Sequence, residues 1–282
     1  MYFKILVPLD GSHLAEQALP VAQALARRCR ADIEFLTVIP AGEVDAAAEG
    51  YGGADRYLSA TAELTGTYRG QINRNVLVGN APSRIVDFAR SQGVDLIVMA
   101  THGRTGLIRE LLGSVTDRVI LASPSPVLVV NGGSAPASGI GEVEIDNIII
   151  PLDGSELAET ALEHGEALAK AFGADVVLLR VAKATATKFE RSLAEHYLAG
   201  ITTCFEGDGS NVTRRVVSGA PVESVIAASG SLHNSLIVMS TRGASGFRRR
   251  LHGSVADQVV RGASVPTMVV PPVATLTGRC MD

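Results

Sequence analysis

The segment Lys4-Ile-Leu-Val-Pro-Leu-Asp-Gly-Ser12 recurs later in the chain as Asn147-Ile-Ile-Ile-Pro-Leu-Asp-Gly-Ser155. A second segment also recurs, because Leu96-Ile-Val-Met-Ala-Thr-His-Gly103 has its counterpart in Leu236-Ile-Val-Met-Ser-Thr-Arg-Gly243. Repetition of two motifs in the same order indicates a duplicated module, and 282 residues are enough for two ordinary domains. We therefore interpret the chain as two tandem copies of one domain.

The repeat also sets the expected boundaries. Copy one spans residues 1–131 and copy two spans 144–272, with a linker at 132–143 and a loose tail at 273–282. The linker is rich in Gly, Ser, Ala and Pro and shows no hydrophobic period. The second copy is slightly shorter, and the loss falls between the counterparts of Val38 and Gly79, where loop variation costs least.

Within copy one, short apolar runs rich in Ile and Val alternate with longer segments of helical character. Runs that are apolar on both faces are typical of a parallel sheet covered by helices on each side. We therefore predict an α/β fold with two doubly wound, Rossmann-like domains, whose ligands bind beyond the carboxyl ends of the strands. The strands are predicted at 5–9, 33–39, 72–78, 96–100 and 127–130. Helices are predicted to follow Ser12, Ala54, Ala81 and Gly113, and Pro20 should kink the first of them.

Composition excludes several classes of protein. Hydrophobic residues make up 46% and charged residues 19%, as in soluble globular proteins, and the net charge of -4 lacks the basic excess of a nucleic-acid binder. No apolar run approaches the roughly 20 residues that span a bilayer, and the N-terminal segment lacks a signal-peptide cleavage site, so a cytoplasmic protein is expected. Cys29, Cys204 and Cys280 form no CxxC pair, which argues against a disulfide framework or a zinc site.

One candidate site follows the first predicted strand of each copy. The residues are Pro8, Asp10, Gly11 and Ser12, repeated as Pro151, Asp153, Gly154 and Ser155. A carboxylate at a strand end can accept hydrogen bonds from ribose hydroxyls or bind a metal held by phosphates. Equally, Asp can stabilise a turn, Gly can allow the bend and Ser can cap the next helix. Both interpretations stay open for either copy.

A second candidate site follows the fourth predicted strand. Glycine lets the backbone approach a phosphate, and free N–H groups at a helix start attract an anion. Ser114 with Asp117, and Ser254 with Asp257, are also spaced as capping boxes. In copy one the candidate residues are His102, Gly103, Arg104, Gly113, Ser114 and Val115, and nine residues separate Gly103 from Gly113. In copy two they are Arg242, Gly243, Gly253, Ser254 and Val255, with the same spacing between the two glycines.

These paired loops resemble those of the universal stress protein family, in its tandem members with two domains in one chain. The nucleotide-binding branch of that family carries a G-x-x-G-x9-G-(S/T) loop. This chain matches it at Gly103, Gly113 and Ser114, and again at Gly243, Gly253 and Ser254. It departs at the first glycine, which is replaced by Ala100 in copy one and by Ser240 in copy two.

The resemblance implies the remaining details of the site. Each domain would have a five-stranded parallel sheet of the adenine nucleotide alpha hydrolase type and would bind an adenine nucleotide, ATP with ADP and AMP as alternatives, with Mg²⁺ held through the phosphates. Asp10 and Asp153 would contact ribose. The backbone near Val38 and Val181 would meet adenine, and Met99 and Met239 would line the pocket. The domains would pair through their last strands, at 127–130 and 268–270, and two chains would form a homodimer.

Other charged residues carry less weight. His102 has Arg242 as its counterpart, which favours a variable loop residue over a catalytic base. Arg248-Arg-Arg250 could grip phosphates, but a solvated helix face is the favoured interpretation. No pair of histidines has the spacing of a metal site.

Three functions follow from these observations. The first is an ATP-binding regulatory protein of stress adaptation, because the chain offers phosphate loops but lacks the P-loop lysine of fast hydrolases. The second is a dimerisation or adaptor scaffold that does not bind ATP, suggested by the lost first glycine. The third, an enzyme acting on an adenylated substrate, has only fold analogy behind it. Because Ala100 is smaller and less polar than Ser240, copy one is expected to bind nucleotide at least as well as copy two.

Overall fold

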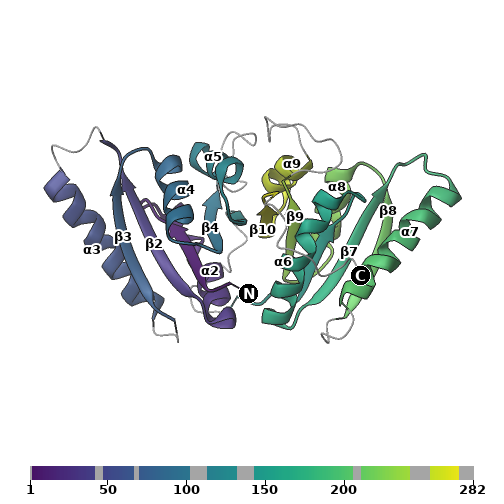
Figure 1. The fold of residues 1–282 in the computed structure, drawn as a ribbon, viewed down its shortest axis with the longest axis horizontal. Helices are drawn as coiled ribbons and strands as arrows, with labels where there is room; N and C mark the ends of the chain where they lie inside the picture. The colour runs from purple at the N-terminus through teal and green to yellow at the C-terminus, as the bar shows by residue number, and fades with distance from the viewer. Residues whose placement is uncertain are drawn as a thin grey trace. The chain divides into compact units, whose positions relative to one another are not determined.

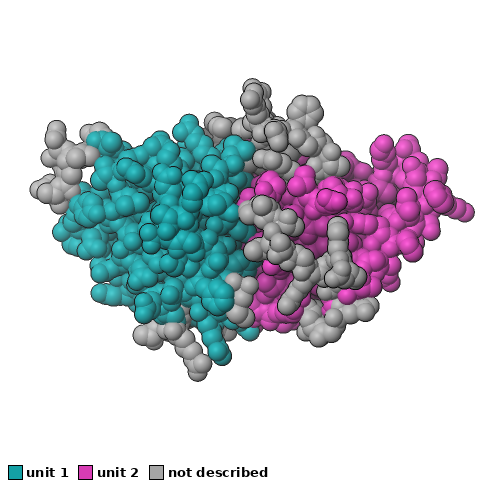
Figure 2. Space-filling model, in the orientation of Figure 1, with its two compact units in different colours: residues 1–143 teal, residues 144–282 magenta. Residues whose placement is uncertain are grey.

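The computed structural model describes residues 2–41, 47–66, 70–101, 113–131, 143–205, 211–241 and 255–272. The chain divides into two compact units, residues 1–143 and 144–282, coloured teal and magenta in Figure 2. The predicted linker and tail lie outside the described residues, apart from Val143.

The first unit alternates strands and helices along the chain (Figure 1). Its sheet has the order β3-β2-β1-β4-β5, and every pair of neighbours within it is parallel. This is the doubly wound topology that the sequence predicts, with the order reversing between β1 and β4. The elements are β1 Lys4–Pro8, α1 His13–Glu16, α2 Leu19–Cys29, β2 Asp32–Ile39, α3 Ala47–Thr65, β3 Ile72–Val78, α4 Ala81–Ser91, β4 Leu96–Thr101, α5 Ser114–Ala122 and β5 Val127–Asn131.

The second unit repeats the plan. Its sheet order is β8-β7-β6-β9-β10, again parallel throughout, and the order reverses between β6 and β9. The elements are β6 Asn147–Pro151, α6 Glu156–Phe172, β7 Asp175–Ala182, α7 Lys188–Thr202, a 3₁₀ turn Thr203–Phe205, β8 Val212–Ser218, α8 Pro221–Gly230, β9 Ser235–Ser240, α9 Val255–Gly262 and β10 Thr267–Val270.

The central strands are buried on both faces, which is why they read as continuous apolar runs. Ile5, Leu6 and Val7 of β1 are fully inaccessible to solvent, as are Ile148, Ile149 and Ile150 of β6. Helices α4 and α5 pack together in the first unit, and α8 and α9 do so in the second. Right-handed crossovers require these helices to share one face of their sheet, because both connections run in the same direction across it.

The first helix differs from its prediction. Pro20 does more than kink it, because the segment forms two helices, α1 and α2, with the proline in the first turn of α2. Proline is tolerated there since its missing N–H has no partner in a first turn. The second unit has Glu163 at this position, and its α6 runs unbroken for 17 residues.

The second helix starts earlier than predicted, at Ala47 rather than after Ala54. Three glycines between residues 50 and 53 weaken the helical signal there. A tertiary contact ties this first part of the helix to the sheet, because the Tyr51 hydroxyl donates a 2.7 Å hydrogen bond to the carbonyl of Val76 on β3. In the described part of the chain, no helix combines the length and the apolar character needed to cross a membrane.

Candidate functional site

The candidate site of each unit lies at the carboxyl edge of its sheet, where the strand order reverses. In the first unit, β1 pairs with β2 on one side and with β4 on the other, so the loops that follow β1 and β4 leave the sheet side by side. The second unit places the loops after β6 and β9 in the same way. Open α/β sheets bind their ligands in the crevice between such loops.

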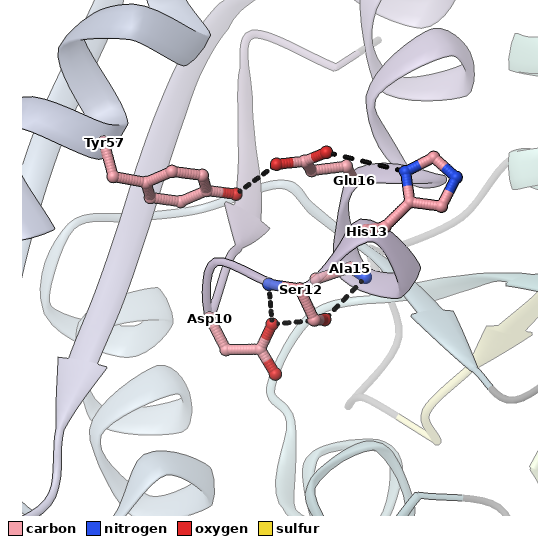
Figure 3. A network of polar contacts seen from close by, with 6 residues as sticks. All are labelled: Asp10, Ser12, His13, Ala15, Glu16 and Tyr57. Carbon is pink, nitrogen blue, oxygen red and sulfur yellow. Dashed lines mark hydrogen bonds and ion pairs between the residues drawn. The ribbon is translucent and has the colours of Figure 1, made fainter.

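Asp10 organises the turn that follows β1 (Figure 3). Its Oδ1 atom accepts hydrogen bonds from the backbone N–H of Ser12 at 3.0 Å and from the Ser12 hydroxyl at 2.6 Å. The Ser12 hydroxyl oxygen accepts from the N–H of Ala15 at 3.1 Å and caps α1. Gly11 takes a φ of +81°, a left-handed conformation that favours glycine. Oδ2 of the exposed Asp10 makes no hydrogen bond with any described residue, so one carboxylate oxygen remains for a ligand.

The second unit reproduces this turn. Asp153 Oδ1 accepts from the Ser155 N–H at 3.0 Å and from its hydroxyl at 2.5 Å, and Ser155 caps α6 through the N–H of Ala158. Gly154 has the same φ of +81° as Gly11. The turn-and-cap interpretation therefore applies to both copies.

A tyrosine and a glutamate join this site in both units, and the sequence analysis missed them. The Tyr57 hydroxyl on α3 donates to Glu16 Oε1 on α1 at 3.1 Å, and the His13 side chain lies 3.8 Å from the other oxygen of Glu16 (Figure 3). Burial, with the adjacent Glu16 carboxylate, raises the pKa of Tyr57 to about 12. In the second unit Tyr197 on α7 donates to Glu159 on α6 at 2.8 Å, and burial again raises the tyrosine pKa.

A buried hydroxyl without a partner lies at the end of the fourth strand of each unit. Thr101 closes β4 with 3% of its surface exposed, and its hydroxyl has no hydrogen-bond partner in the structure as described. Thr241 follows β9 directly, and its hydroxyl is likewise buried and unpartnered. Native proteins satisfy nearly all such groups, so an orphaned hydroxyl repeated in both copies requires an explanation.

The helix after the second loop begins differently from its prediction. Gly113, not Ser114, is the N-cap of α5, and as a glycine it offers no side chain to cap that helix. The predicted capping box of Ser114 and Asp117 is therefore wrong, because Ser114 already belongs to the helix and its exposed side chain lies one residue past the capping position. The first N–H groups of α5 consequently receive no cap from the N-cap residue. The equivalent box of Ser254 and Asp257 falls partly outside the described residues.

Most of the other predicted pocket residues that the structure describes lie in strands or at strand ends. Val38 and Val181 are the penultimate residues of β2 and β7, and Pro8 and Pro151 end β1 and β6. Met99 and Met239 are 6% exposed, and Met239 packs in the hydrophobic core of its unit. Ala100 is half-buried in β4, Ser240 is buried at the end of β9, and Val255 begins α9. The predicted residues His102, Gly103, Arg104, Arg242, Gly243, Gly253 and Ser254 lie outside the described part of the chain.

One residue makes the two sites unlike. Thr37 of β2 donates from its hydroxyl to the carbonyl of Leu9 at 2.9 Å. Its counterpart in β7 is Arg180, whose Nη1 donates to the carbonyl of Leu152 at 3.2 Å and whose guanidinium lies 5.6 Å from the centre of the Tyr197 ring. The second site therefore carries a large cation at a position where the first carries a small hydroxyl.

Comparison with known proteins agrees with the duplication. The sequence model of the Universal stress protein family matches residues 1–131 and again residues 144–271. Universal stress protein MJ0531 of Methanocaldococcus jannaschii is 34% identical over 140 residues, which cover 46% of this chain and 82% of that protein. Universal stress protein Rv2005c of Mycobacterium tuberculosis is 29% identical over 230 residues, covering 77% of this chain and 70% of that protein.

A solved structure shows the same fold over nearly the whole length. A universal stress protein from Archaeoglobus fulgidus aligns with a TM-score of 0.72 and 20% sequence identity. The alignment covers 95% of this chain and 96% of that one. At this level of identity the similarity establishes the shared fold.

Proposed function

Because the chain belongs to the universal stress protein family, with two tandem copies of its domain, we propose that it is a regulatory protein that binds ATP at the carboxyl edges of its sheets. The observation that carries the proposal is the orphaned threonine hydroxyl, Thr101 or Thr241, at the end of the fourth strand of each unit. It lies in the strand beside the one that ends in the aspartate turn, and a bound polar ligand would satisfy it.

Each part of the nucleotide has a proposed contact. Oδ2 of Asp10 would accept hydrogen bonds from ribose hydroxyls, while Oδ1 keeps the turn in place through Ser12. The backbone near Val38 would meet adenine. The N–H groups at the start of α5, which Gly113 does not cap, would bind phosphate oxygens, since they lie at the positive end of a helix. Mg²⁺ would be held chiefly by the phosphates, as is usual for that ion.

We propose binding rather than rapid turnover, because the sequence lacks the lysine of the P-loop. ADP and AMP are the natural competitors of ATP for such a site, and slow hydrolysis is compatible with it. In this proposal the protein acts in the cytoplasm, its domains pair through β5 and β10, and two chains associate. A downstream partner would recognise the nucleotide-bound form of the protein.

The test is calorimetric titration of the full chain with Mg·ATP, using two variants at Gly113 that match in size and differ in charge. Gly113→Asp puts a carboxylate at the N-cap of α5, where it repels phosphate; Gly113→Asn gives an equally good cap without the charge. The proposal expects wild type to bind ATP, the Asp variant to lose the first site and the Asn variant to retain most of its affinity. Equal binding by both variants would contradict the phosphate role of this helix start.

The replacement of the first loop glycine by Ala100 and Ser240 favours a second candidate, a scaffold that does not use nucleotide. The two candidates differ in what the Asp variants do in cells. If Gly113→Asp with Gly253→Asp leaves stress survival, stability and oligomeric state unchanged, nucleotide is incidental and the scaffold is the better description. Loss of survival with normal stability supports nucleotide binding.

A further inference from the structure

We infer that Arg180 closes the adenosine end of the pocket in the second unit, so that the first unit is the tighter ATP site of the chain. This inference rests on the proposed function. It concerns a single pair of equivalent positions, Thr37 in β2 and Arg180 in β7. Thr37 comes directly after the last residue of β2 in register with β1, and Arg180 directly after the last residue of β7 in register with β6.

The two side chains make the same anchoring contact but reach different distances. The Thr37 hydroxyl donates to the carbonyl of Leu9, the residue directly before Asp10, and the side chain extends no further. Arg180 donates to the equivalent carbonyl of Leu152, directly before Asp153, and its guanidinium continues across the strand end to the ring of Tyr197. The arginine thus bridges the aspartate loop and α7, while the shorter threonine contacts only the aspartate loop.

The space beside the two glycines of the aspartate turns confirms this difference. A methyl group built on Gly11 would meet no atom within 4 Å. A methyl group built on Gly154 would meet Arg180 Nη1 at 3.0 Å and Nη2 at 3.3 Å. Because the backbone conformations of the two turns match, with φ of +81° at both glycines, the guanidinium alone accounts for the lost room.

The position of Arg180 in the sheet argues that it opposes the ligand instead of binding its phosphates. Strand β6 lies between β7 and β9, and the phosphate loop follows β9. The backbone of Arg180 on β7 is therefore two strands away from β9, at about 10 Å given the usual strand spacing. Arg180 instead directly precedes Val181 in β7, and its side chain contacts the carbonyl of Leu152, the residue before Asp153. Val181 and Asp153 are the residues proposed to meet adenine and ribose.

Nucleotide could enter the second site only after the guanidinium left its present contacts. Its hydrogen bond with Leu152 and its cation–π contact with Tyr197 would both break. Losing two such contacts weakens binding by about tenfold to a hundredfold. The first unit has no such penalty, since Thr37 stays clear of the crevice.

The reciprocal exchange of these two residues tests the inference. ATP stoichiometry would be measured by calorimetry on four full-length proteins: wild type, Arg180→Thr, Thr37→Arg and the double exchange. The expected numbers of tight sites are one, two, none and one. In the double exchange the remaining site should move to the second unit, so that Gly253→Asp abolishes it and Gly113→Asp does not.

Each alternative result has a definite meaning. Two equal sites in wild type that Arg180→Thr leaves unchanged would overturn the inference and leave the proposed function intact. Loss of a second-unit site in Arg180→Thr would also overturn it, since the guanidinium would then be a ligand contact. Absence of ATP binding from all four proteins would overturn the proposed function itself. Both replacements are residues that one unit already accommodates, and circular dichroism with thermal unfolding checks that each variant is folded.

Discussion

The hydroxyl of Tyr57 donates a hydrogen bond to a carboxylate oxygen of Glu16, 3.1 Å away. The pair joins α3 to α1 beside the Asp10 turn, and the second unit has the same contact at 2.8 Å. In both copies this polar contact holds the helix that follows the aspartate turn, α1 or α6, against the next long helix, α3 or α7.

Removing the tyrosine hydroxyl should cost stability in either unit. We expect Tyr197→Phe to lower the free energy of unfolding by about 1 kcal/mol, since the ring still packs and only the hydrogen bond with Glu159 is lost. Urea denaturation measures this change, and Tyr57→Phe should give a similar one. Glu159→Gln is the matched control, because its amide oxygen can still accept the bond. A phenylalanine variant as stable as wild type would show that the contact contributes nothing.

The same pair makes stability fall at alkaline pH. The folded-state pKa of Tyr57, about 12, exceeds its ordinary value of 10, so the unfolded chain loses this proton first as pH rises. The contribution of protonated Tyr57 to the free energy of unfolding is complete below pH 10 and is lost as the pH approaches 12. Urea midpoints measured across this range should decline less steeply for Tyr57→Phe than for wild type. Parallel curves would contradict the assignment.

His164 should produce the opposite pH dependence in the second unit. Burial in α6 lowers its pKa from 6.5 to about 4, so the unfolded chain takes up a proton first as pH falls. Stability is therefore lost between pH 6.5 and 4, by at most about 3 kcal/mol. The equivalent residue in the first unit is the buried Val21. His164→Val should flatten this part of the stability curve, and a curve as steep as that of wild type would exclude His164 as its cause.

The sequence predicts the sheet better than the helices. Strand β3 is predicted to the residue, and the other strands of the first unit to within one residue at each end, because runs buried on both faces are an unambiguous signal. The start of α3 is missed because three glycines weaken the helical pattern there, and no local pattern reveals tertiary contacts such as that of Tyr51 with β3. Pro20 predicts a disruption of the first helix, but its position at the start of a separate helix, α2, depends on packing.

The candidate site, too, could be predicted only where its contacts are local in the sequence. The aspartate turns follow from the motif alone, since Asp-Gly-Ser satisfies its own backbone locally. Tyr57 and Glu16 are 41 residues apart and meet only through helix packing. Their recurrence at equivalent positions in the second copy was the available signal. Arg180 carries no motif, and only the substitution of a threonine by an arginine between the copies could have drawn attention to it.

A buried ion pair distinguishes the last helix of the second unit. Arg261 Nε donates to Asp257 Oδ1 at 2.8 Å, with 13% and 7% of the two side chains exposed, whereas the first unit has the half-exposed Leu121 in place of the arginine. Arg261→Leu should destabilise the second unit by about 2 kcal/mol, because the Asp257 charge stays buried without this cation. Adding Asp257→Asn should recover part of the loss in chemical denaturation. A single variant as stable as wild type would mean that the pair is energetically neutral.

The first long helix offers an exchange between the two copies. Glu163 lies inside the unbroken α6, where a proline would remove the hydrogen bond to the carbonyl of Glu159 and clash with it, whereas Pro20 lies in the first turn of α2. Glu163→Pro should therefore lower the free energy of unfolding by about 2 to 3 kcal/mol. The loss is smaller than this if α6 can divide into two helices, as the equivalent segment does in the first unit. Hydrogen exchange over residues 156–166 locates the change, with Glu163→Ala as the control. Rapid exchange confined to the turn before the proline would show that the second unit has adopted the broken arrangement of the first, and a loss below about 0.5 kcal/mol would contradict the assigned role of proline.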